Sequence, residues 1–421
     1  MTKTNQVNWK QLLYKAWNSY CKKKRRNSEE ESISNFESFA KANKKRLAVI
    51  KRHLDREDYH FGKWKATLIP KNDGSNRLLI IPSNINDKLV LKAISDYLSG
   101  LLADIFDSVS SISYAYQKGK SSREALLQLK RMHNPENVLL KIDIRHFFDE
   151  IDKSILIQLL DQYSIDRYVK ELICSGINPN VDYSCLEKSD ADKFPQSGIP
   201  QGISISAVLS NLYLYDLDKL AVSENWKMVR YADDMVLSVS NREEALLLLS
   251  QIENFLCEER KLTIHPLQDS SDAKTAIFQN PKKKQMKYLG VIFNGKDLYP
   301  TNECCCLLIN KIKSICKNTS SCKEKSINSS IAQWCGYYAF TDVPNGKIKS
   351  MNRAINYQIN KYGLNYKVDL TSVLLKTRRR QNSRLAKLIH PTRIGEEYEW
   401  LNIDWMCLNP WASFCEHDSL K

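Results

Sequence analysis

The chain has 421 residues, too many for one compact core, so two or three structural units are expected. Its 43% hydrophobic and 26% charged residues exclude wholesale disorder, and no stretch approaches the roughly 20 apolar residues that span a bilayer. The net charge of +15 favours a polyanionic partner, although a basic surface that only keeps the protein soluble explains the charge equally well.

The first residues and the cysteines bear on the compartment. The start, MTKTNQVNWK, lacks the apolar run of a secretion signal, so we expect a cytoplasmic protein without membrane attachment. The 12 cysteines are spread along the chain, and the run Cys304, Cys305 and Cys306 has no His or Cys partners at zinc-finger spacing. We therefore expect reduced cysteines that fill apolar positions, and no zinc site.

Residues 1–65 read as a basic N-terminal extension, with one basic run from Lys22 to Arg26 and another from Lys41 to Arg52. Within the second run, apolar side chains recur at helical spacing and predict an amphipathic helix: Leu47, Ile50 and Leu54. A charge run is usually a solvated face, and contact with a nucleic-acid backbone is the alternative.

The next segments alternate between strand and helix patterns. Residues 66–82, ATLIPKNDGSNRLLIIP, contain two β-rich runs around Asn72-Asp73-Gly74, the composition of a tight hairpin turn. Residues 86–103 have helical spacing, and residues 138–144, VLLKIDI, suit a buried strand. A helix is expected over the following SILIQLLDQYSI.

The second half of the chain is mainly helical by pattern. Residues 203–221 predict an apolar helix, residues 227–239 two short β runs around a polar centre, and residues 242–261 another helix. A short strand, YLGVIF, comes next. The remaining residues are rich in Lys and Arg and predict more helices.

The most informative segment is Tyr231-Ala232-Asp233-Asp234, which has apolar residues on both sides. Two adjacent carboxylates in an apolar hairpin lose hydration and repel each other, and a divalent cation removes both costs. Mg²⁺ takes oxygen ligands, commonly one or two carboxylates. A surface turn rich in Asp is the alternative, but the apolar flanks favour a metal site.

A third carboxylate, Asp143, ends the apolar run VLLKID, where a buried acid is unusual unless it is paired or binds metal. Asp149 and Asp152 lie in a more polar setting and fit a helix start better. Asp143 and Asp233 therefore make a plausible two-metal clamp for phosphoryl transfer. The loop Ser197-Gly198-Ile199-Pro200-Gln201-Gly202 leads into an apolar helix and, by itself, is a weak signal.

Taken in order and spacing, these segments resemble the reverse transcriptases over about residues 65–295. The strand ending in Asp143 resembles their first catalytic motif, SGIPQGISIS their PQG motif, and YADD their second catalytic box. LTIHP with Lys274-Thr275 is similar to a following LTINP…KT motif, and Tyr288-Leu289-Gly290 is similar to the primer grip. Upstream, IPKNDGSNRLLIIP resembles the fingers hairpin. This many motifs in the same order rarely agree by chance.

The resemblance implies a role for each matched residue. The implied metal contacts, for Mg²⁺ with Mn²⁺ as a possible substitute, are Asp143, Ile144, Asp233 and Asp234. The implied substrate contacts are Lys71, Arg77, Ile144, Phe148, Gln201, Gly202 and Tyr231, with Lys71 and Arg77 meeting the incoming triphosphate. Lys274 would protonate the leaving pyrophosphate, and the implied primer grip is Tyr288, Leu289 and Gly290.

Phe148 lies where the family places a bulky steric gate, five residues after Asp143. An aromatic ring there would collide with a ribose 2′-OH, so deoxynucleotides would be preferred. Packing in the core is the competing interpretation of Phe148, with its neighbour Phe147 as the control.

The resemblance extends to a subgroup. Residues Gln333 to Tyr338, QWCGYY, are similar to the GWxxYY of the thumb in group II intron-type enzymes, although aromatic core explains them equally well. No Val-Thr-Gly of the retron kind follows YADD, and Gln201-Gly202 stands where diversity-generating enzymes have Ser-Gln. The ISIS after PQG and the helical tail look like the stand-alone antiphage defence-associated reverse transcriptases.

The resemblance implies an α+β, right-hand polymerase fold. Its palm would be a split βαβ unit with an antiparallel sheet, next to fingers and a helical thumb. We expect residues 1–65 to form the N-terminal extension and residues 66–137 and 165–200 to form the fingers. Residues 138–164 and 201–295 would form the palm, and residues 296–421 the thumb and C-terminal region. The implied activity is RNA-templated DNA polymerisation from dNTPs, with an RNA template encoded nearby and a cDNA product. A maturase-type RNA-binding scaffold, a retron-like enzyme and an RNA polymerase are the alternatives.

Overall fold

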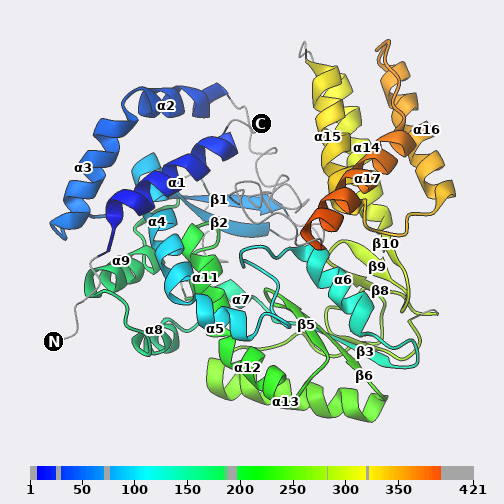
Figure 1. The fold of residues 1–421 in the computed structure, drawn as a ribbon, viewed down its shortest axis with the longest axis horizontal. Helices are drawn as coiled ribbons and strands as arrows, with labels where there is room; N and C mark the ends of the chain where they lie inside the picture. The colour runs from blue at the N-terminus through cyan, green and yellow to red at the C-terminus, as the bar shows by residue number, and fades with distance from the viewer. Residues whose placement is uncertain are drawn as a thin grey trace. The chain divides into compact units, whose positions relative to one another are not determined.

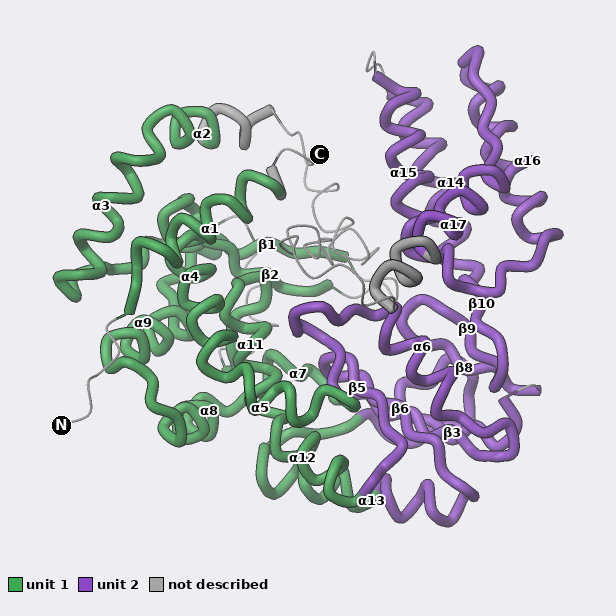
Figure 2. The backbone as a smooth tube through the Cα atoms, viewed as in Figure 1, with its two compact units in different colours: residues 1–112, 144–224, 250–264 green, residues 113–143, 225–249, 265–421 purple. Residues whose placement is uncertain are grey.

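The computed structural model describes residues 7–24, 30–70, 76–184, 186, 197–281, 283–318 and 322–389. The chain divides into two compact units (Figure 2), and Figure 1 labels their helices and strands. Unit 1 comprises residues 1–112, 144–224 and 250–264, and unit 2 comprises residues 113–143, 225–249 and 265–421. The predicted division into fingers, palm and thumb stays a prediction.

Unit 1 combines helices with a small sheet. Its elements are α1 (Trp9–Lys24), α2 (Glu30–Lys41), α3 (Asn43–Asp55), β1 (Trp64–Pro70), β2 (Asn76–Pro82), α4 (Ile85–Leu101), α5 (Ala103–Ser108), α7 (Phe147–Glu150), α8 (Lys153–Asp161), α9 (Arg167–Ile177), β4 (Val181–Asp182), α11 (Ser204–Tyr213) and α12 (Tyr215–Ser223). β1 lies between β2, which is antiparallel to it, and β4, which is parallel. The apolar helix α4 packs against both α1 and α11.

Several predictions for unit 1 are confirmed. The hairpin of residues 66–82 forms from β1 and β2, although its turn, with Lys71, lies outside the described residues. The three apolar side chains predicted to line a helix in the basic extension are buried on α3. Asp152 caps the start of α8, as its polar setting indicates, by accepting from the Ser154 and Ile155 amides.

One buried carboxylate joins the start of β1 to α4. Asp87 of α4 is 1% exposed and accepts hydrogen bonds from the Tyr59 hydroxyl at 2.6 Å and from Trp64 Nε1 at 2.9 Å. The Gly62 amide and the Asn84 side chain donate to it as well, both at 3.0 Å. A buried carboxylate is tolerated when its oxygens are satisfied in this way.

Unit 2 is built on antiparallel sheets with helices beside them. Its elements are α6 (Ser122–Met132), β3 (Val138–Asp143), β5 (Met228–Tyr231), β6 (Asp234–Val239), β7 (Ala276–Phe278), β8 (Met286–Tyr288), β9 (Val291–Phe293), β10 (Leu298–Pro300), α14 (Asn302–Lys317), α15 (Lys323–Tyr338), α16 (Asn345–Lys361) and α17 (Leu370–Ile389). The helix α13 (Arg242–Arg260) begins in unit 2 and continues into unit 1.

The larger sheet of unit 2 has the order β5-β6-β3-β7, with every neighbouring pair antiparallel. Its central strand β3 is buried along its whole length, which explains the near-continuous apolar run of its sequence. A smaller sheet, β10-β9-β8, leads into α14 to α17, which gather beyond β10 in Figure 1. One hydrophobic core runs from both sheets into these helices.

Two sequence predictions were wrong in detail. YLGVIF is not one strand, because β8 ends at Tyr288 and β9 begins at Val291, with Leu289 and Gly290 forming the turn at φ +48° and +74°. The helix predicted over residues 203–221 is broken at Leu214, which leaves the helical conformation at φ −100° and ψ 4°. The periodicity of apolar residues continues through both breaks and therefore does not reveal them.

In the part of the chain that the structure describes, every helix is too short or too polar to span a bilayer. Four of the described cysteines are buried, namely Cys304, Cys305, Cys316 and Cys335. Cys257, Cys306 and Cys322 are exposed, so the prediction of apolar filler is right for only part of the set.

Candidate active site

Strand pairing in unit 2 brings the predicted catalytic carboxylates to one edge of its larger sheet. β3 ends at Asp143, which lies opposite Asp234 at the start of β6. Asp234 in turn pairs with Tyr231 at the end of β5, so Ala232 and Asp233 form the hairpin turn between them. Segments far apart in the sequence therefore place three carboxylates at neighbouring strand ends.

The negative charge of Asp143 affects the pKa values of both Asp234 and Lys274. Asp143 is 4% exposed, and the ammonium Nζ of Lys274 lies 2.7 Å from its Oδ2. Burial, and then the negative charge of Asp143, raises the pKa of Asp234 from 3.8 to about 7. Burial by itself lowers the pKa of Lys274, but the ion pair with Asp143 outweighs it and the pKa is raised overall.

The YADD hairpin is supported by a buried cation, Arg230. Arg230 is 1% exposed and donates from Nη1 to the Ala232 carbonyl at 2.9 Å and from Nη2 to the Ser113 hydroxyl at 2.9 Å. Ala232 has a φ of +57°, a left-handed conformation that is strained for a residue with a side chain. The Arg230 contact therefore holds a strained turn next to Asp233.

Carboxylate oxygens are the donors that Mg²⁺ prefers, and a bound cation would offset both the burial and the repulsion from Asp143 that raise the pKa of Asp234. The donor chemistry therefore fits a magnesium ion. Among the residues that the structure describes, however, no group of three or more His, Cys, Asp or Glu side chains is arranged to hold a metal ion. The Lys274 ammonium is the cation that lies against Asp143 here.

The predicted PQG loop lies in unit 1 and is fastened to the turn that contains Phe148. The Ile199 amide donates to the Phe148 carbonyl at 2.9 Å, and the Gln201 side chain donates to Asp149 Oδ1 at 3.0 Å. Gly198 has a φ of +82°, and a Cβ there would lie 2.3 Å from the Phe148 carbonyl oxygen. Only glycine fits this close approach of two backbones.

The same loop is tied to β2, because the Ile80 amide donates to the Gln201 carbonyl at 2.9 Å. Gly202 follows with a φ of +101° and is exposed. Arg77 lies exposed near the start of β2. Unit 1 therefore joins the predicted PQG loop and the described part of the predicted fingers hairpin through one backbone hydrogen bond.

The two phenylalanines of the predicted gate have different environments. Phe147 is 3% exposed, whereas Phe148 is half-buried, and their ring centroids lie 5.3 Å apart. Phe147 is thus the core residue of the pair, and part of the Phe148 ring is accessible. Ile144, which follows Asp143 in the chain, is buried in unit 1, where it forms an isolated bridge with Ile264.

Of the predicted primer grip, Tyr288 is the last residue of β8, and Leu289 and Gly290 form the turn between β8 and β9 in unit 2. Tyr288 is 2% exposed, and its hydroxyl donates to the Asp234 carbonyl at 3.4 Å. The predicted primer grip and the strand that begins at Asp234 are therefore in contact.

Sequence reasoning missed the residues that support the site. Arg230, Ser122 and Tyr337 are buried and contact the YADD hairpin or the primer-grip turn, and none was predicted as a site residue. Arg230 carried a sequence signal, a lone charge within the apolar run MVRY, and Tyr337 lies in the QWCGYY segment that resembles the GWxxYY of intron-type thumbs. Ser122 is identified only by its contacts in the fold.

Comparison with known proteins bears on the same segments. The family model described as "Reverse transcriptase (RNA-dependent DNA polymerase)" matches residues 69–293, more than half of the chain. The group II intron-encoded protein LtrA of Lactococcus lactis subsp. cremoris is 30% identical over 166 residues, which cover 39% of this chain and 26% of LtrA.

The putative COX1/OXI3 intron 1 protein of Saccharomyces cerevisiae is 23% identical over 244 residues, or 58% of this chain and 27% of that protein. The chain thus matches only about a quarter of the length of these relatives. Among solved structures, apo telomerase from Candida tropicalis aligns with a TM-score of 0.46 at 13% identity. That alignment covers 78% of this chain and 59% of the telomerase.

Proposed function

Because the chain belongs to the reverse transcriptase family, with the right-hand polymerase fold of that family, we propose that it is an RNA-templated DNA polymerase. The observation that carries the proposal is the register of unit 2, which sets Asp143 opposite Asp234 beside the YADD turn. Buried, mutually repelling carboxylates are costly to a protein that only binds RNA, whereas phosphoryl transfer requires them.

We propose that Asp143, Ile144, Asp233 and Asp234 hold Mg²⁺, or Mn²⁺ in its place. When bound, the metal lowers the pKa of an attacking hydroxyl and neutralises charge on the phosphates. The chain's own residues supply the rest. Lys274, whose ammonium lies 2.7 Å from Asp143, would give a proton to the departing pyrophosphate.

The remaining site residues are proposed to bind the substrates. Gln201 and Gly202 would line the nucleotide pocket with Tyr231, and Arg77 and Lys71 would meet the triphosphate. The accessible part of the Phe148 ring would exclude a ribose 2′-OH, which makes dNTPs the preferred substrates. The turn Tyr288-Leu289-Gly290 would hold the primer end.

A primer-extension assay on an RNA template with Mg²⁺ tests the polymerase proposal. The wild-type protein should extend the primer with dNTPs, and Asp233→Asn should reduce extension at least 100-fold. Phe148→Ala should gain the use of rNTPs, whereas Phe147→Ala, in the core, should lose stability without that gain. Unchanged cDNA synthesis by Asp233→Asn would reject the enzyme, and equal use of dNTPs and rNTPs by the wild type would reject the gate.

We further propose that the template is a noncoding RNA encoded nearby and that the cDNA serves antiphage defence in the cytoplasm. Support comes from the ISIS sequence after PQG and from the helical C-terminal region, which look like the defence-associated reverse transcriptases. Sequencing the nucleic acid that co-purifies with the protein tests this. Abundant cDNA from an adjacent noncoding gene supports it.

A group II intron-type maturase, an RNA-binding scaffold, is the second candidate, favoured by the similarity to intron-encoded proteins. Co-purified intron RNA, together with splicing that survives Asp233→Asn, would favour this candidate. A retron-like enzyme would instead yield cDNA joined to its own template RNA.

A further inference from the structure

The last residues of α15 contact the turn that carries the predicted primer grip. The Tyr337 hydroxyl donates to the Leu289 carbonyl at 2.8 Å, and the Tyr338 hydroxyl donates to the Gly290 carbonyl at 3.3 Å. Both tyrosines are buried, at 4% and 1% exposure, and their rings meet edge to face with centroids 4.7 Å apart. Two adjacent phenols thus bind two adjacent carbonyls of one turn.

This turn needs external support. Leu289 has a φ of +48°, a left-handed conformation that is strained for a residue with a side chain. Such strain persists only where surrounding contacts over-determine the conformation. The bond from Tyr337 to the Leu289 carbonyl is such a contact, and it orients the peptide group that the primer backbone would meet.

Tyr337 is also connected to the catalytic hairpin. The Ser122 side chain, at the start of α6, lies beside Tyr337 and beside Tyr231 of YADD. Ser122 is 6% exposed, so these contacts are shielded from water. A second connection runs directly, since the Tyr288 hydroxyl contacts the Asp234 carbonyl at 3.4 Å. The primer-grip turn and the carboxylate hairpin are therefore linked through buried hydroxyls.

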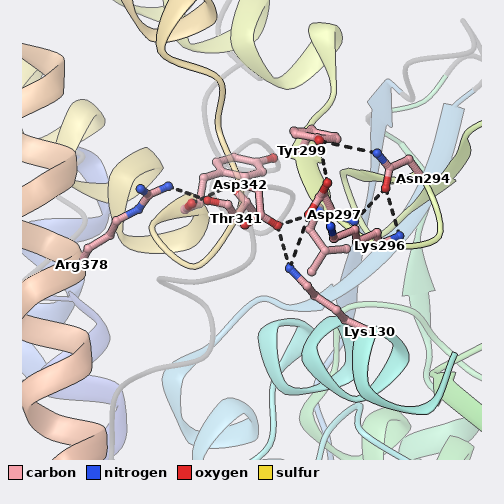
Figure 3. A network of polar contacts seen from close by, with 10 residues as sticks. Lys130, Asn294, Lys296, Asp297, Tyr299, Thr341, Asp342 and Arg378 are labelled. Carbon is pink, nitrogen blue, oxygen red and sulfur yellow. Dashed lines mark hydrogen bonds and ion pairs between the residues drawn. The ribbon is translucent and has the colours of Figure 1, made fainter. Parts of the chain in front are cut away.

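The end of α15 is itself fixed in place, as Figure 3 shows. Arg378 of α17 donates to the Ala339 carbonyl at 2.8 Å and also to that of Thr341. Asp342 accepts from Lys130 of α6 at 2.8 Å and from the Leu298 amide at 3.1 Å. Because the residues at the end of α15 are bonded to α6, β10 and α17, Tyr337 and Tyr338 are held in position against the primer-grip turn.

We propose that Tyr337 is a positioning residue, which with Ser122 fixes the primer-grip turn relative to the YADD hairpin. Through this connection, the distance between the end of a bound primer and the carboxylates that act on it stays constant. The inference rests on the proposed polymerase function and adds to it two residues that do not touch the reacting atoms.

The test compares Tyr337→Phe and Ser122→Ala with the wild type. Tyr337→Phe keeps the buried ring and removes only the hydroxyl, and Ser122→Ala removes the link to Tyr231. Tyr366→Phe is the matched control, because it removes a hydroxyl that bonds to Asn328. Three quantities are measured for each protein: the thermal midpoint, the Kd of an RNA–DNA primer–template by fluorescence anisotropy, and the KM and kcat of primer extension.

Loss of one buried hydrogen bond should raise the Kd and KM for primer–template about five- to tenfold in Tyr337→Phe, and shorten the product made per binding event. Ser122→Ala should shift the same quantities in the same direction. The double variant should be less impaired than the product of the two single effects, because both act on one connection. Tyr366→Phe should match the wild type.

A wild-type KM and Kd for primer–template in both variants would overturn the inference. A fall in activity that only follows the thermal midpoint, without a KM change, would also overturn it, since that is the signature of lost stability. If Tyr337→Phe does not fold, Ser122→Ala decides the matter by itself. No extension by the wild type would instead reject the proposed polymerase, and the inference with it.

Discussion

Asp234 is a carboxylate whose environment opposes its charge, so its replacement by the neutral isostere Asn should stabilise the protein while abolishing catalysis. Its pKa of about 7 means that between pH 4 and pH 7 the folded protein retains a proton that the unfolded chain has lost. The free energy of unfolding therefore falls as the pH rises through this window. Above pH 7 the ionised group costs the folded state its full penalty.

The size of this penalty follows from the two pKa values. A difference of about 3 between folded and unfolded states corresponds to about 4 kcal/mol. Asn loses hydration on burial as well, so we expect Asp234→Asn to gain about 2–3 kcal/mol at pH 8 and little at pH 4. Urea unfolding at these two pH values measures the gain.

The control is Asp55→Asn, which also removes one negative charge from a chain of net charge +15 but at an exposed position. It should change the stability by less than about 0.5 kcal/mol at either pH. Added Mg²⁺ should raise the thermal midpoint of the wild type more than that of Asp234→Asn. A variant no more stable than the wild type at pH 8 would refute the raised pKa that burial and the charge of Asp143 give to Asp234.

Three other substitutions test the supports of the fold and the site. Arg230→Lys should lose about 2–3 kcal/mol in urea unfolding, because a single ammonium cannot replace the guanidinium hydrogen bonds to both Ala232 and Ser113. Full stability would contradict that account. Gly198→Ala, whose Cβ would meet backbone at 2.3 Å, should lose more stability than Gly119→Ala, which has φ +76° but open space, and equal losses would refute the role of the close approach. Burial lowers the pKa of His133 to about 4, so the contribution of neutral His133 to the free energy of unfolding is complete above pH 6.5 and declines by about 3 kcal/mol as the pH falls towards 4. Urea unfolding should therefore show that His133→Asn costs less stability at pH 5 than at pH 7.5. An equal cost at both pH values would contradict the lowered pKa.

The sequence by itself determined the local elements of the site. Two of these elements follow from residue order: the apolar strand β3 that ends in Asp143, and the polar centre of the β5–β6 hairpin. Both patterns of apolar and polar residues are local, so they can be predicted without knowledge of distant contacts. The family resemblance of these motifs was equally a property of the sequence, and it is confirmed by the match over residues 69–293.

The tertiary structure determined which residues of these elements contact one another. Only the pairing of β3 with β6 set Asp143 against Asp234, and only the packing of the Lys274 segment brought its ammonium to Asp143. The break of YLGVIF at Leu289 is stabilised by carbonyl contacts from Tyr337, a residue near the end of a distant helix. Local periodicity carries no information about such long-range hydrogen bonds, since they depend on which surfaces the whole core brings together.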